Sequence, residues 1–186
     1  MNDVEREPAG DGLGPADVFV PAVDLPSTIT AIRLAGAIRE DSARVLANWA
    51  MRVAVLPVFR ADPTLSLVDL QEDMPELLES ILDAVSVSPY ELDPGPRDQA
   101  AARAEAHGAR RAQYYPIDAV IAEIQSLQRE VRNAIWRLGQ EASADVLHEL
   151  DERLNEVFEI AERSVATAWV RYRYESTDPH ASGAAA

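Results

Sequence analysis

The sequence predicts an all-α fold, a bundle of about five helices that ends in a long carboxy-terminal helix. Apolar residues recur every three or four positions through most of the chain, which is the period of an amphipathic helix. No segment alternates convincingly between apolar and polar residues, as a half-buried strand does, and no repeat of fixed length appears. A globin-like arrangement of the same helices is the alternative architecture.

Length and local composition divide the chain into three parts. With 186 residues, the chain has the size of one ordinary domain with tails. Residues 1–25 are acidic and rich in Asp, Pro and Gly, which predicts a flexible arm. Residues 26–175 carry the helical pattern and form the expected folded domain. Residues 176–186 are mostly small or turn-forming, which predicts a disordered tail.

The first predicted helix opens at Pro26 and ends at Pro57, in one piece or two. A second helix follows Ser66, which has Asp69 three residues later in a capping arrangement. Pro75 removes a backbone donor inside this second pattern. It therefore predicts either a kink or a fresh helix start with Asp73 as the cap. The segment SVSPYELDPGP that follows contains three prolines and is predicted to be a loop.

An alanine-rich helix is predicted from residue 98 to about residue 114. Its inward face has only small residues, which permit another helix to approach closely: Ala100, Ala104, Gly108 and Ala112. The clearest amphipathic helix then runs from Pro116 to Gly139. The last helix begins at a Ser143 cap and continues to Tyr172. About 30 helical residues would span roughly 45 Å, which exceeds one small domain.

The charge balance and the absence of cysteine exclude several classes of function. The chain has 17 basic and 32 acidic residues, a net charge of -15, so nucleic acid would be repelled and is not an expected partner. Without cysteine there are no disulfides or thiolate metal sites, which fits a cytoplasmic protein. The amino terminus lacks the pattern of a secretory signal, and no apolar stretch approaches the roughly 20 residues of a membrane helix.

A cationic strip is predicted on one side of the alanine-rich helix, because steps of three and four residues return to the same face. It consists of Arg103, His107, Arg110, Arg111 and Tyr114. Arginine offers paired donors that match planar anions, so the strip is a candidate contact for a ligand or for an acidic partner. The alternative is that these charges sit in the last turns of a helix, where they suit the helix dipole.

No catalytic residues and no metal site are predicted. His148 opens the string HELDERL, but a zinc-protease helix needs a second histidine four residues later, where this chain has Glu152. The same string resembles the phosphoacceptor box of sensor histidine kinases, which leaves histidine phosphotransfer as one alternative. No cofactor is predicted either. A haem sensor would need a buried histidine ligand, and His107 is the one histidine that lies next to small packing residues.

Two motifs carry a family resemblance. One is the run Leu70, Met74, Pro75, Leu77 and Leu78, and the other is His107 followed four residues later by Arg111. With the order of the helices, they make residues 35–172 resemble the RsbRD N-terminal domain family. These domains belong to the RsbR-type co-antagonists of RsbT and also occur ahead of bacterial histidine kinases. The chain departs from the family at Glu123, which is followed by isoleucine where the family often has tyrosine.

The resemblance implies a non-enzymatic sensor or interaction domain in bacterial signal transduction and stress-response regulation, with a signalling protein as its partner. A long final helix that outlasts its core would expose Val165, Trp169 and Tyr172, so these residues are the candidate interface of a homodimer. Small-molecule or haem sensing that involves His107 and Arg111 is the alternative from a different class. The tryptophans, Trp49 and Trp136 as well as Trp169, are interpreted as core or interface residues.

Overall fold

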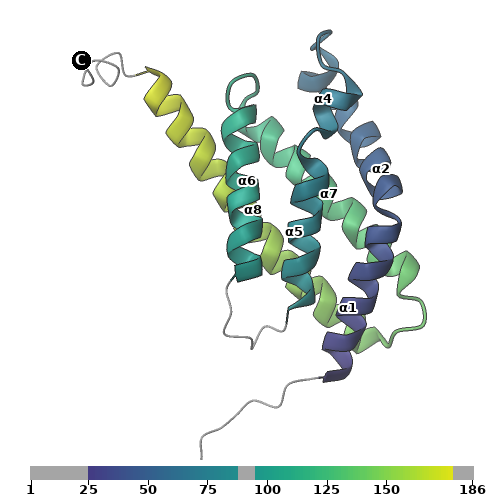
Figure 1. Ribbon diagram of the computed structural model, residues 1–186. Helices are drawn as coiled ribbons and strands as arrows, with labels where there is room; N and C mark the ends of the chain where they lie inside the picture. The colour runs from purple at the N-terminus through teal and green to yellow at the C-terminus, as the bar shows by residue number, and fades with distance from the viewer. Residues whose placement is uncertain (1–24, 88–94, 178–186) are drawn as a thin grey trace, which may run out of the picture.

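The computed structural model describes residues 25–87 and 95–177. All regular secondary structure in these two ranges is α-helical, so the predicted all-α class is confirmed (Figure 1). The predicted arm up to residue 24, residues 88–94 of the predicted loop and the tail from residue 178 lie outside the described residues. The helices are α1 (Leu25–Glu40), α2 (Ser42–Ala54), α3 (Pro57–Arg60), α4 (Leu67–Gln71), α5 (Met74–Ser86), α6 (Gly95–Arg111), α7 (Ile117–Leu138) and α8 (Ala144–Thr177).

The first predicted helix is divided in two, with a break at Asp41 between α1 and α2. The bundle therefore has six longer helices in its described part, and α3 and α4 are single turns. Pro57 is the first residue of α3, where its missing N–H would have had no helical partner. Leu56 before it is extended, as the residue before a proline usually is.

The two predicted signals around α4 and α5 have different outcomes. Ser66 and Asp69 form a capping box: the Asp69 N–H donates to Ser66 Oγ at 3.1 Å, and the Ser66 N–H donates to Asp69 Oδ2 at 3.1 Å. Pro75 lies in the first turn of α5, so it marks a fresh start rather than a kink. Asp73 occupies the cap position, but its side chain makes no capping bond. The predicted cap is wrong because this carboxylate binds His107 instead.

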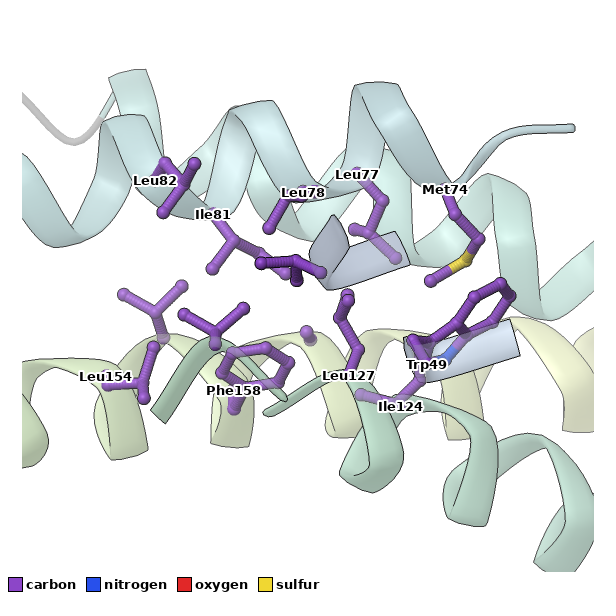
Figure 2. Close-up of a cluster of buried hydrophobic side chains, with 14 of the residues drawn as sticks. Trp49, Met74, Leu77, Leu78, Ile81, Leu82, Ile124, Leu127, Leu154 and Phe158 are labelled. Atoms are coloured by element: carbon purple, nitrogen blue, oxygen red, sulfur yellow. The ribbon is translucent and has the colours of Figure 1, made fainter. Parts of the chain in front are cut away.

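One hydrophobic core joins the helices. Figure 2 shows Leu77 and Ile81 of α5 on the side that faces α7 and α8, across from Leu127 and Phe158. These side chains are at most 1% exposed, and each large apolar side chain buried in this way contributes about 1.5–3 kcal/mol. Trp49 lies at one end of the same cluster and is fully buried, as predicted. Trp136 is 51% exposed, so it is not a core residue, and its place in an interface stays a prediction.

Helices α6 and α8 pack closely along the small-residue face of α6 (Figure 1). A Cβ atom placed on Gly108 would lie 2.6 Å from the main-chain oxygen of Val165 and 2.7 Å from its Cα. Real side chains do not approach a backbone so closely, so only glycine fits this position. The close approach predicted for this face is confirmed.

This packing changes the interpretation of the predicted dimer interface on α8. Val165 is fully buried against α6, so it is not an open surface residue, and that part of the prediction is wrong. Trp169 is partly buried, and its Nε1–H donates to the main-chain oxygen of Tyr115 at 2.9 Å. Tyr172 is also only partly exposed. Val170, which is 42% exposed, is one of the open apolar residues near the end of α8.

Helix α8 has 34 residues and continues to Thr177, two residues past the predicted end of the domain. At 1.5 Å per residue it is about 50 Å long. Figure 1 shows its carboxy-terminal part leading away from the other helices. No helix in the two described ranges is both long and apolar enough to cross a lipid bilayer.

Candidate functional site

Four charged residues form one cluster, which we call the buried ion network: Asp73, whose side chain is 16% exposed, and the buried His107, Arg111 and Glu123. His107 lies between two carboxylates, with Nδ1 2.8 Å from Asp73 Oδ2 and Nε2 3.2 Å from Glu123 Oε2. Arg111 Nη2 donates to the other oxygen of Glu123 at 2.9 Å. The side chains of His107 and Glu123 are 0% exposed.

Helix geometry explains why one carboxylate holds both cations. His107 and Arg111 are four residues apart on α6, so their side chains lie on the same face. Glu123 projects from the facing α7 and uses one oxygen for each. Two further bonds extend the network: Arg111 Nη2 donates to the main-chain oxygen of Leu70, and Trp49 Nε1–H donates to that of Glu123. The network thus connects α2, α4, α5, α6 and α7.

The pKa shifts of His107 and Asp73 leave both of these residues charged at neutral pH. Burial lowers the pKa of His107, but the charge of Glu123 and the hydrogen bonds with Asp73 and Glu123 outweigh it and raise the pKa to about 9. Burial likewise raises the pKa of Asp73, but its hydrogen bond with His107 and the nearby positive charges lower the pKa to about 2. At neutral pH the His107 imidazolium therefore faces the Asp73 carboxylate, which Arg110 Nη2 also approaches to 3.4 Å. Removing one member of a buried ion pair leaves the other charge without its partner, which is strongly destabilising.

This protonation pattern predicts a loss of stability at alkaline pH. The pKa of His107 is about 9 in the folded chain and 6.5 ordinarily, so its contribution is complete below about pH 6.5 and lost as the pH rises to about 9. The free energy of unfolding should fall by up to about 1.4 kcal/mol per pH unit in that range. Urea titrations at several pH values measure this slope. His107→Gln should lose it and the exposed-histidine control His148→Gln should keep it; equal slopes in both variants would contradict the assignment.

A polar pocket of about 240 Å³ lies beside the network and shares Arg111 with it. Its lining comes from two segments: residues 62–72 contribute three carboxylates, which we call the acidic wall, and the last turn of α6 contributes two arginines, which we call the arginine wall. Tyr115 follows the end of α6, also lines the pocket and is buried. The lining residues are Asp62, Thr64, Leu65, Asp69, Glu72, Arg110, Arg111, Tyr114 and Tyr115.

Tyr115 connects the polar pocket to the core and to α8. Its hydroxyl donates to Asp62 Oδ2 at 2.8 Å, and its ring packs on Phe59 with 4.6 Å between centroids. Burial and the bond to Asp62 raise the pKa of Tyr115 to about 12, so the phenol keeps its proton. Its main-chain oxygen is the acceptor for Trp169 of α8. Tyr115, which lines the pocket, and Trp169, which belongs to α8, are therefore joined directly by this hydrogen bond.

The structure separates the members of the predicted cationic strip. His107 and Arg111 are buried and paired with carboxylates, and Arg110 is 42% exposed at the pocket. Arg103 is exposed and does not line the pocket. Tyr114 follows the end of α6 and is 71% exposed. The five residues do not form one anion-binding surface, because His107 is enclosed between two carboxylates and Arg103 lies away from the pocket that Arg110, Arg111 and Tyr114 line.

The residues of the network do not fit a haem or a metal ion. An axial haem ligand needs one ring nitrogen directed at the iron, but both nitrogens of His107 bind carboxylates. Those carboxylates lie at opposite sides of the imidazole, so they do not converge on one point. Within residues 25–87 and 95–177, no three His, Cys, Asp or Glu side chains are arranged as metal ligands.

His148 lies on α8 and does not line the polar pocket. Its side chain is 76% exposed, and Nε2 lies 3.4 Å from Glu152 Oε1 one turn later.

No protein-family model, no curated protein and no solved structure matches the chain. The function must therefore be argued from the network and the pocket themselves.

Sequence reasoning missed two of the four network residues and most of the acidic wall. A signal for Glu123 was present, because it interrupts the apolar face of α7 beside Val120, Ile124 and Leu127. A charged residue in such a stripe is seldom buried without a partner. Asp73 had no comparable signal, since an aspartate before Met-Pro also reads as an ordinary helix cap.

Proposed function

We propose that the chain is a non-enzymatic signal-input domain in which a small ligand in the polar pocket alters the packing of α8. The observation that carries the proposal is the bond from Trp169 of α8 to the main chain of Tyr115, a residue that lines the pocket. The end of α8 then presents the altered state to a second copy or to a signalling protein. This function agrees with the resemblance to the RsbRD N-terminal domain family.

The chemistry of the buried ion network favours binding over catalysis. A general base must reach its substrate and have a pKa near the working pH. His107 is 0% exposed, is bonded through both ring nitrogens and has a pKa of about 9. The network is therefore suited to fixing helices in place rather than to moving protons.

Two contacts connect the pocket side of the bundle to α8. Gly108 lies between His107 and Arg111 in sequence and packs directly on the backbone of Val165. Tyr115 accepts the hydrogen bond from Trp169, four residues further along α8. A shift of α6 or of the turn after it must therefore open one of these contacts or carry α8 with it. Packed interfaces of this kind tend to have discrete arrangements, which is the requirement for a switch.

The proposed output surface is the part of α8 after Trp169. Val170 is 42% exposed there, and the helix leads away from the bundle (Figure 1). A homodimer or a complex with a signalling partner would cover this surface. Val165, originally expected in that interface, instead belongs to the internal coupling between α6 and α8.

Tyr115→Phe tests the proposal without a known ligand. The variant loses the hydroxyl bond to Asp62, worth about 1 kcal/mol, and should loosen the turn that holds Trp169. Amides of residues 166–176 should exchange with deuterium about fivefold faster, as measured by mass spectrometry. Tyr114→Phe, at the exposed neighbouring tyrosine, is the matched control and should leave these rates unchanged. No change, or an equal change at residues 146–158, would contradict coupling between the pocket and α8.

A further inference from the structure

The charges of the polar pocket are separated onto two walls. Asp62, Asp69 and Glu72 come from the segment before α5, and Arg110 and Arg111 come from the end of α6. Building on the proposed input function, we propose that the pocket binds a small zwitterion of the α-amino-acid type. Its carboxylate lies against the arginines, and its ammonium group lies against Asp69 and Glu72.

The arginine wall has donors to offer a carboxylate. The side chain of Arg111 is only 8% exposed, and Nη2 makes both of its hydrogen bonds to protein, while the buried Nε has no hydrogen-bond partner. Arg110 makes only long ion pairs, 3.6 Å to Glu72 and 3.4 Å to Asp73. The planar guanidinium of Arg110, whose side chain is 42% exposed, offers paired donors that match a carboxylate.

The acidic wall retains carboxylate oxygens for an ammonium group. Both oxygens of Asp62 already accept hydrogen bonds, from Thr64 and from Tyr115, so this residue fixes the wall. The bonds from Ser66 to Asp69 all go to one oxygen, Oδ2. The Glu72 side chain is 70% exposed and meets Arg110 only at the long distance of 3.6 Å. A weak, exposed pair of this kind is readily replaced by ligand charges of the same two signs.

Charge and size both favour a small ligand that carries both signs. A phosphate would face three carboxylates in a chain of net charge -15, and a diamine would face two arginines. A zwitterion matches both walls. The volume of about 240 Å³ is below the roughly 300–1,000 Å³ of sites for drug-sized ligands. Leu65 and Tyr114 add apolar surface for the ligand's side chain.

Calorimetric titration of the full chain with each of the common L-amino acids tests this inference. At least one amino acid should bind, and its amide and its N-acetyl derivative, which lack one charge each, should not. Arg110→Gln and Glu72→Gln should each weaken binding about tenfold or more, as expected for the loss of a charge-assisted contact. Arg103→Gln, an exposed arginine on the same helix away from the pocket, should leave the affinity unchanged.

Several results would overturn the proposal that the pocket binds a zwitterion. Binding of putrescine alone would make the pocket a cation site, and binding of inorganic phosphate alone would make it an anion site. Failure of all amino acids at millimolar concentration, or binding unaffected by both pocket variants, would also reject it. The deuterium exchange of Tyr115→Phe uses no ligand. If that result holds while the amino acids fail, the ligand class is wrong and the input function stands.

Discussion

Replacing Glu123 by alanine is expected to destabilise the protein by about 3–5 kcal/mol, or to prevent folding. Its side chain is 0% exposed and accepts from both His107 and Arg111. Without Glu123, Arg111 keeps its charge in the interior with the carbonyl of Leu70 and the ring of Tyr115 as its neighbours, and neither carries an opposite charge. The remaining cation, rather than the lost pair itself, causes most of the destabilisation.

Urea denaturation followed by circular dichroism measures this loss. Asp118→Ala, at an exposed carboxylate on the same helix, is the control and should change stability by no more than about 0.5 kcal/mol. If Glu123→Ala does not fold, Glu123→Gln keeps the shape and an acceptor and should show a smaller loss in the same direction. A loss in both variants no greater than that of the control would mean that the network does not hold the helices together.

Replacing Gly108 by alanine is expected to destabilise the protein by about 2–3 kcal/mol. The new Cβ would lie 2.6 Å from the main-chain oxygen of Val165. Because the obstructing atoms are backbone, α6 and α8 must move apart. This loss exceeds the roughly 1 kcal/mol by which alanine ordinarily improves a helix over glycine.

Gly36→Ala is the matched control for this substitution. Gly36 also lies within a helix, α1, but a Cβ there would meet nothing within 4 Å. That variant should therefore be neutral or more stable by about 0.5–1 kcal/mol. Thermal unfolding of the two proteins under the same conditions gives the comparison. Equal behaviour of the two alanine variants would contradict the close packing of α6 on α8.

The helices could be predicted from local sequence, but their pairing could not. Periodicity and the Ser66–Asp69 capping box indicate where α4 begins. The small residues on one face of α6 predict that another helix packs closely against it. The prediction that Asp73 caps α5 is wrong because its carboxylate binds His107, 34 residues later in the chain. Local sequence rules do not predict that α6 brings His107 to this position.

The same reason explains the error at Val165 and the division of the cationic strip. From the sequence, Val165 is an apolar residue in the second half of a long helix, beyond the expected core. The structure shows that α6 covers it. Arg111 and Arg103 have the same side chain, but only Arg111 faces a carboxylate on α7. Which arginine is buried depends on a contact across the bundle.

The indole resonances of the three tryptophans provide the most direct test of coupling between the pocket and α8. In Tyr115→Phe, the Nε1–H signal of Trp169 should shift, because that group donates to the altered turn. The signal of Trp136, which is 51% exposed, should stay in place. A two-dimensional ¹H–¹⁵N spectrum of each protein gives the answer. A shift confined to Trp169 is the predicted result; an unmoved Trp169 signal would contradict the account.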